Sequence, residues 1–144
     1  NMPAGIGEPV FEKLSANLGK AILSIGAVKA FEIGDGTAVA HALGHTNNDQ
    51  YTRDPDGKII KLTNHSGGIL GGISSGMPIV FRVAFKPTPS IAQPQETIDY
   101  SSLSNEVIEV KGRHDPCVVL RAVPVVEAAA NIAILSHMLD YPNF

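Results

Sequence analysis

Apolar residues recur at helical spacing near the beginning of the chain. Gly7-Glu8-Pro9 is a helix-start signal, because proline is tolerated in the first turn of a helix. Charged residues fall away from the apolar stripe, which is made of Phe11, Leu14, Leu18 and Ile22. The pattern therefore predicts an amphipathic helix over about residues 9–22.

The middle of the chain has shorter apolar segments separated by turn-forming residues. A short helix is predicted after the Gly34-Asp35-Gly36 turn, over residues 38–43. Residues 91–104 are predicted to be loop, because Pro, Gln and Ser interrupt any regular pattern. Residues 45–57 are polar and form an exposed loop or a hairpin tip. Strands are predicted over residues 25–33, 58–62, 78–85 and 107–111.

A second, longer helix is predicted near the end of the chain, from Pro124 to about Asp140. Apolar residues surround its axis, and a helix of that kind is buried on most sides. Such burial is unusual in a lone domain of 144 residues, so partners absent from the sequence are indicated. We expect no transmembrane segment, because the apolar stretch is interrupted by Arg121, Glu127, Asn131 and His137.

The length and composition of the chain predict a single domain that is large enough to bury a hydrophobic core. Charged residues are 17% of the chain, below the ~25% typical of soluble domains, which suggests that something covers part of the surface. The net charge is -3 with no basic run, which argues against nucleic acid as the main partner. The single cysteine, Cys117, excludes an internal disulfide framework, and a buried, small apolar role is expected for it. No signal peptide is visible.

Two segments could contact a ligand or could simply be turns. Residues 66–76 contain five glycines in eleven residues, which could cradle a phosphate with backbone N–H groups or form a tight turn. They match neither the Walker A loop nor the dinucleotide fingerprint. Residues 86–90 (Lys-Pro-Thr-Pro-Ser) offer rigid donors for a planar polar ligand, although a strand-ending turn explains them equally well. His41 and His45 are four residues apart, but the ligand set is too incomplete to predict a metal site.

The segment Gly112-Arg113-His114-Asp115-Pro116-Cys117 places a fixed cation, an imidazole and a carboxylate within three residues. Such a cluster could bind an anion and move a proton at one place. Taken alone, Arg113 and Asp115 would more simply pair with each other or cap the following helix. The order of motifs along the whole chain decides between these interpretations.

That order resembles the C-terminal part of chorismate synthase. The last matching segment contains Arg113-His114-Asp115-Pro116, the Arg-x-Asp-Pro of the family's C-terminal signature, with Glu127 following in the apolar run. The resemblance spans nearly the whole chain, and the matching segments are residues 5–11, 24–36, 63–76, 85–90 and 112–128. On this basis residues 1–2 are interpreted as a cloning remnant and start, and residues 3–144 as the C-terminal portion of a longer enzyme.

The resemblance implies an α+β fold, part of a β-α-β sandwich with antiparallel strands and buried helices. It also implies a carbon–oxygen lyase that converts 5-enolpyruvylshikimate 3-phosphate into chorismate and phosphate by 1,4-anti elimination. The reaction needs reduced FMN and belongs to the shikimate pathway of aromatic amino-acid biosynthesis. A cytoplasmic homotetramer associated with NADP is implied, with neither nucleic acid nor membrane as partner.

The same resemblance assigns residues to the site. Asp115 would lie near the central nitrogen of the flavin and take part in proton movement. Gly26 departs from the family, in which Asn or Pro is common at that position, so its contact survives only if it uses the backbone. Cofactor contacts are expected from Gly26, Ala27, Gly71, Lys86, Pro87, Thr88, Pro89, Ser90 and Arg113.

The family's N-terminal half carries two catalytic histidines, a flavin contact and several substrate-binding arginines, none of which can be assigned here. We therefore expect this chain alone to be inactive and to bind flavin weakly or not at all. Two alternatives remain: a non-catalytic folding or assembly module that self-associates, and an unrelated phosphate-binding α+β domain.

Overall fold

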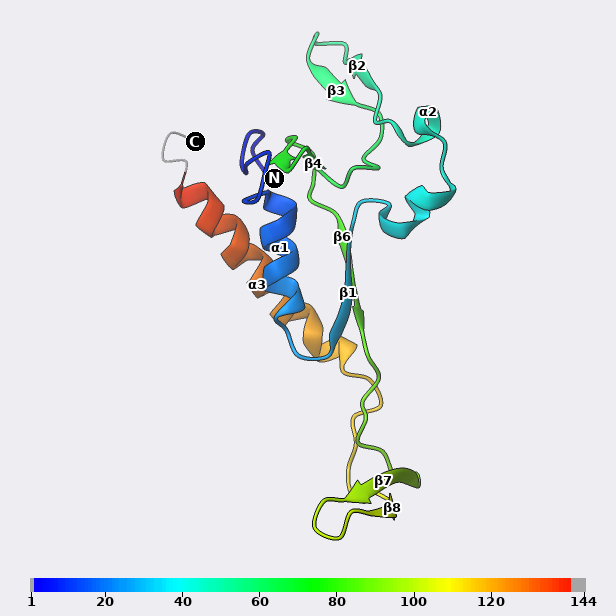
Figure 1. The fold of residues 1–144 in the computed structure, drawn as a ribbon. Coiled ribbons are helices and arrows are strands. Elements are labelled where there is room, and N and C mark those ends of the chain that lie inside the picture. Colours follow the sequence, from blue (N-terminus) through cyan, green and yellow to red (C-terminus); the bar gives the residue numbers. More distant parts are fainter. Residues whose placement is uncertain (1, 141–144) are drawn as a thin grey trace.

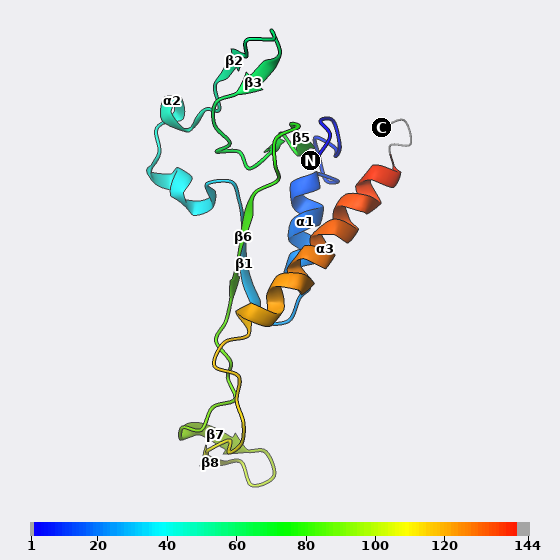
Figure 2. The same ribbon diagram turned by 180° about the vertical axis from the view of Figure 1, so that it is seen from behind.

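The computed structural model describes residues 2–140. Two helices, α1 and α3, lie side by side against a ribbon of two strands, β1 and β6 (Figures 1 and 2). Two hairpins extend from this body in opposite directions, and the one containing β7 and β8 lies farthest from the body. The helices and strands are α1 (Leu14–Leu23), β1 (Val28–Ile33), the 3₁₀ helix η1 (Gly36–His41), α2 (Gly44–Asn47), β2 (Tyr51–Arg53), β3 (Ile59–Lys61), β4 (Ile69–Leu70), β5 (Ile73–Ser74), β6 (Phe81–Phe85), β7 (Gln95–Asp99), β8 (Ser104–Ile108) and α3 (Val119–Leu139).

The four pairs of strands are all antiparallel: β1 with β6, β2 with β3, β4 with β5, and β7 with β8. In the central pair Val28 lies opposite Phe85 and Ile33 opposite Phe81, with an irregularity between Val28 and Ala30. This mixture of helices and antiparallel strands confirms the predicted α+β class.

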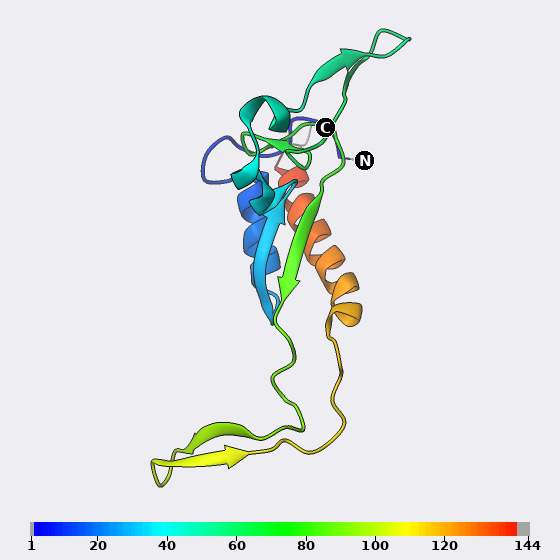
Figure 3. The ribbon, with the colours of Figure 1, turned by 90° about the vertical axis from the view of Figure 1, so that its right-hand side faces the viewer.

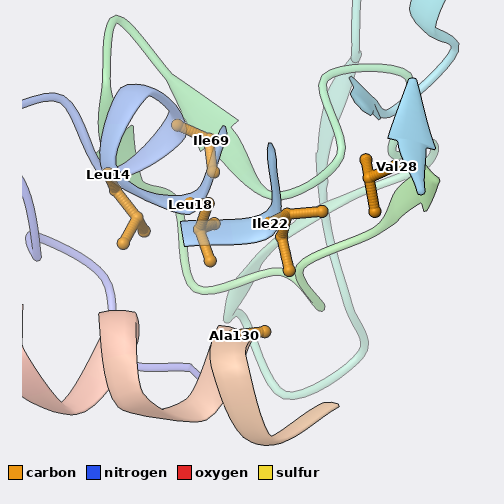
Figure 4. Packing of buried hydrophobic residues seen from close by; sticks show 6 residues of the cluster. All are labelled: Leu14, Leu18, Ile22, Val28, Ile69 and Ala130. Carbon is orange, nitrogen blue, oxygen red and sulfur yellow. The ribbon is translucent and has the colours of Figure 1, made fainter. Parts of the chain in front are cut away.

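The core forms where α1 contacts both the ribbon and α3. Leu14, Leu18 and Ile22 are fully buried along one side of α1, at the spacing that brings side chains to one helix face (Figure 4). Gly19 on the same helix allows the ring of Phe31 on β1 to approach closely. The other buried members of the cluster are Val28, Ile69 and Ala130.

The predicted amphipathic helix is present, but the prediction of where it begins was wrong. α1 begins at Leu14, and the N–H of this residue donates to the carbonyl of Gly72 at 2.8 Å. Phe11, predicted as the first residue of the stripe, precedes the helix at φ 58 and is 88% exposed. The Gly7-Glu8-Pro9 segment therefore marks a turn ahead of the helix.

α3 begins at Val119, five residues before Pro124, which lies inside the helix and removes one backbone donor. Only Ala122, Ala130 and His137 of this helix are buried, while Leu120 is 84% exposed. The expectation of burial on most sides is thus wrong for the described residues, because α1 and the ribbon cover only one side. By length and composition, α3 is the one helix within residues 2–140 that could cross a membrane, where the sequence predicted none. The core helix of a soluble protein can pass the same test.

The glycine-rich run forms the β4–β5 hairpin, whose two turn residues have φ 61 (Gly71) and 97 (Gly72). This geometry favours glycine, because side chains clash at positive φ. Gly67 has φ 64 and packs so closely on Gly34 that a Cβ would overlap its backbone. Close packing of backbones therefore explains most of the glycines in this run.

Residues 86–118 form an arm that leaves the body after β6 and returns at the start of α3 (Figure 3). The prediction of loop over 91–104 was wrong, because β7 lies there and pairs with β8. The strand predicted over 107–111 lies instead over Ser104–Ile108. Cys117 is exposed, so the buried role expected for it is wrong in this chain.

Candidate functional site

The turn from α1 to β1 forms one side of the candidate site. The N–H of Val28 donates to the carbonyl of Ile25 at 3.3 Å, which closes a turn with Gly26 and Ala27 in the middle. Ala27 has φ 71, a conformation usually left to glycine. Its carbonyl accepts a 2.8 Å hydrogen bond from the N–H of Lys86, which joins this turn to the end of β6. The strained turn thus brings two of the predicted contact segments together.

Replacing Ala27 by Gly should raise the free energy of unfolding by about 0.5–1 kcal/mol. Glycine relieves about 1–2 kcal/mol of strain in this left-handed backbone conformation. This gain exceeds the roughly 0.4–1 kcal/mol of stability that is lost because glycine increases the conformational entropy of the unfolded chain. Denaturant unfolding measures the change. Ala30→Gly, on the exposed face of β1, is the matched control and should lower stability. A loss of stability in Ala27→Gly would show that the methyl group makes a contact that matters.

His114 joins the two connections of the arm. Its Nε2 lies 2.7 Å from the carbonyl of Val110, and because a carbonyl can only accept, Nε2 carries a proton. Its Nδ1 lies 3.3 Å from the Ser90 hydroxyl. This side chain therefore brings two predicted contact segments, residues 86–90 and residues 113–115, close together in space. His114 belongs to the predicted Arg113–Asp115 cluster, but no local signal in the sequence indicates this bridging role.

Asp115 pairs with Arg121 and not with Arg113. Arg121 Nη1 lies 3.0 Å from Asp115 Oδ2, and the Asp115 side chain is 39% exposed. Since α3 begins early, Arg121 lies in its first turn, close enough to reach back to this carboxylate. Within residues 2–140 neither Lys86 nor Arg113 forms an ion pair, so both exposed cations are available to an anion.

Gly71 lies away from the other predicted contacts. It is exposed at the tip of the β4–β5 hairpin, next to the residue that contacts the first turn of α1. Gly26 and Ala27 follow the last turn of the same helix. A helix of ten residues is about 15 Å long, so these positions lie at opposite ends of it (Figure 1). Nine of the ten predicted site residues thus lie at or next to the base of the arm, and Gly71 does not.

A second polar cluster, not predicted from the sequence, surrounds Asp49. Its carboxylate accepts hydrogen bonds from the Thr63 hydroxyl (2.8 Å), the His65 N–H (2.7 Å), and the N–H and hydroxyl of Ser66 (3.1 and 2.6 Å). Lys61 Nζ lies 3.5 Å away, and the Asp49 and Lys61 side chains are only 4% and 3% exposed. Asp49 therefore ties the β2–β3 hairpin to the start of the glycine-rich run.

The model of the family described as chorismate synthase matches residues 1–139. The chain belongs to the chorismate synthase family. Its relatives include a chorismate synthase of Lachnoclostridium phytofermentans, 60% identical over 139 residues, which cover 96% of this chain and 38% of the relative. One from Methanothermobacter thermautotrophicus is 53% identical over 137 residues, covering 95% and 37%.

A solved structure of a chorismate synthase has the same fold. The TM-score is 0.75 at 28% sequence identity, and the match covers 98% of this chain and 35% of that structure. The family resemblance and the fold class are thereby confirmed. The alternative of an unrelated phosphate-binding domain is wrong. The chain spans less than two-fifths of the length of the chorismate synthases that it matches.

Proposed function

We propose that this chain is the C-terminal part of a chorismate synthase and forms one wall of its flavin and phosphate site. The whole enzyme would be a carbon–oxygen lyase that converts 5-enolpyruvylshikimate 3-phosphate into chorismate and phosphate by 1,4-anti elimination, with reduced FMN. The observation that carries this proposal is the long match to chorismate synthases, which includes the base of the arm. A cytoplasmic homotetramer associated with NADP is part of the same proposal.

The residues at the base of the arm suit the phosphate end of such a cofactor. Lys86 and Arg113 are exposed and without ion-pair partners among the described residues, and both can donate to phosphate oxygens. Pro87 and Pro89 stiffen the segment that carries Thr88 and Ser90, so little entropy is lost when a ligand binds. Gly26 and Ala27 contribute backbone at the neighbouring turn. Gly71 is too far away to join this group within one chain.

Asp115 is the proposed proton carrier. Arg121 holds one oxygen of its carboxylate, while the side chain stays 39% exposed and open to a reacting group. A carboxylate held in this way can take up or release a proton without leaving its place. Bound reduced flavin would lend electron density to the reaction and recover it, with no net redox change.

A second candidate function is non-catalytic: a folding or assembly module that self-associates through surfaces covered in the whole enzyme. The exposed apolar residues of α3, among them Leu120, Ile132 and Leu139, favour this possibility. Nucleic acid and membrane have no part in either proposal. Light scattering combined with a flavin fluorescence titration separates the two functions. Association without flavin binding favours the module, and turnover by this chain alone would contradict its expected inactivity.

In the intact enzyme, replacing Lys86 and Arg113 by Ala together should weaken FMN binding by at least about 10-fold. Each substitution removes a charge-assisted hydrogen bond to the phosphate, which contributes roughly 1.5–3 kcal/mol to binding. Flavin fluorescence titration measures the affinity. Lys29→Ala removes an exposed cation of β1 and serves as the control. Unchanged affinity in the double variant would remove these two residues from the site.

A further inference from the structure

The hairpin formed by β7 and β8 is attached to the body only through its two connections. Residues 95–108 pair within themselves, and no other helix or strand among the described residues makes more than isolated contacts with them (Figures 1 and 3). An isolated two-stranded hairpin is only marginally stable in water. It nevertheless exposes large apolar side chains, namely Ile98 (47%), Tyr100 (86%), Leu103 (79%), Val107 (67%) and Ile108 (48%). This hairpin needs a surface to cover it.

The tip of the hairpin is built to hold two of these side chains outward. Asp99 accepts a 2.7 Å hydrogen bond from the N–H of Ser101, and its carbonyl accepts one of 2.8 Å from the N–H of Leu103. Leu103 has φ 55, which costs a residue with a side chain about 1–2 kcal/mol. The strained turn displays Tyr100 and Leu103, and large apolar anchors of this kind dominate protein interfaces.

Charge along the arm is divided between its two parts. Residues 95–108 contain Glu96, Asp99 and Glu106 and no basic residue. The chain has a net charge of -3, so the eleven acidic and eleven basic residues outside the hairpin balance. The two connections, residues 86–94 and 109–118, contain the basic residues Lys86, Lys111 and Arg113 and the acidic residues Glu109 and Asp115. Asp115 is already paired with Arg121 of α3. One end of the arm is thus acidic, and the part nearer the body carries a net positive charge.

A second copy of the chain fits this arrangement. The arm lies at the end of the molecule opposite the last turn of α3 (Figures 1 and 2). Lys86 and Gln95 are nine positions apart, a distance of at most about 30 Å even for a fully extended chain. Two arms side by side and antiparallel would therefore place each acidic hairpin against the positively charged connections of the other. A two-fold axis makes both contacts at once.

We propose that the arm of residues 86–118 is an interface to a second copy of this chain. Two arms lie antiparallel, burying Tyr100 and Leu103 and pairing carboxylates of each hairpin with Lys111 of the other copy, a cation that the proposed flavin site does not use. The inference rests on the homo-oligomer of the proposed function and names the surface that forms it. This interface does not depend on flavin binding, so the inference can be wrong while the proposed enzyme activity is correct.

A charge swap in the intact protein tests the pairing. Glu96→Lys and Lys111→Glu should each weaken self-association at least 10-fold in sedimentation equilibrium, because each places like charges together. The double variant should recover most of the loss. Asp56→Lys makes the same charge change on the β2–β3 hairpin and should leave association unchanged. Equal effects of Asp56→Lys and Glu96→Lys, or no rescue in the double variant, would overturn the proposal.

Photo-crosslinking gives a readout that does not depend on folding defects. Benzoylphenylalanine in place of Tyr100 should yield a covalent dimer upon irradiation, and mass spectrometry should find the link within the partner's residues 86–118. The same analogue in place of Tyr51, which is 60% exposed on β2, is the control and should give no such link. A link from position 100 only to its own chain would show that the rest of the polypeptide covers the arm and would end this inference.

Discussion

Replacing Asp115 by Asn in the intact enzyme is expected to lower kcat by roughly 10²–10⁴-fold, the range for removal of a positioned acid or base. The asparagine side chain has nearly the same size as aspartate and can still accept one hydrogen bond from Arg121, so the start of α3 should stay in place. What is lost is the ability to exchange a proton. Single-turnover measurements with saturating reduced FMN would separate this chemical step from binding.

The pair with Arg121 provides the control, because an ion pair before a helix could also be purely structural. Arg121→Ala breaks the same 3.0 Å contact but leaves the carboxylate present. If Asp115 carries the proton, Arg121→Ala should lower kcat far less than Asp115→Asn does. Equal losses of kcat in both variants would assign Asp115 to structure alone.

Replacing Asp49 by Ala should lower the free energy of unfolding by about 3–5 kcal/mol, the cost of removing one partner of a buried ion pair. The variant leaves the Lys61 ammonium buried without a counter-charge, since Lys61 Nζ has no hydrogen-bond partner among the described residues. It also removes the acceptor for Ser66 and Thr63. Urea denaturation at neutral pH measures the loss. Asp56→Ala, at an exposed carboxylate on the adjacent hairpin turn, should change stability by less than about 0.5 kcal/mol.

The contribution of Asp49 should also depend on pH. Burial by itself raises the pKa of Asp49, but hydrogen bonds from Ser66 and Thr63 outweigh it and hold that pKa well below its usual range. Because the folded pKa is below the unfolded value of about 3.9, the contribution is complete above that value and is lost as the pH falls further. The stability difference between the natural chain and Asp49→Ala should therefore shrink below about pH 4. A difference that stays constant down to pH 2 would show that the charge of Asp49 does not matter.

Local patterns predicted the elements that bury one regular face. The helical spacing of Leu14, Leu18 and Ile22 was enough to find α1, because all three face the same core. β7 was missed, because its side chains are mostly exposed and no buried face imposes alternation. Phe11 and the early start of α3 show the same limit at helix ends, where contacts with other segments decide the boundary.

The candidate site was found by motif order more than by geometry. Nothing local indicates that Ala27 would adopt a positive φ, or that Asp115 would pair with Arg121, since both depend on where the next element begins. Asp49 was missed as well, because its hydrogen-bond partners lie 14 to 17 residues further along the chain. The assignment of Gly71 to the same group remains a prediction that one copy of the chain does not satisfy.

By itself, the sequence determined the family, the α+β class and the segments that carry the candidate chemistry. These depend on residue identity and short-range periodicity, which can be read along the chain. Only the tertiary structure decided which of these segments meet, which carboxylate each cation pairs with, and that an acidic hairpin extends away from the body. Such contacts depend on where the backbone turns: tight turns hold Ala27 and Leu103 at a positive φ, and Pro124 lies inside α3, each against its local preference.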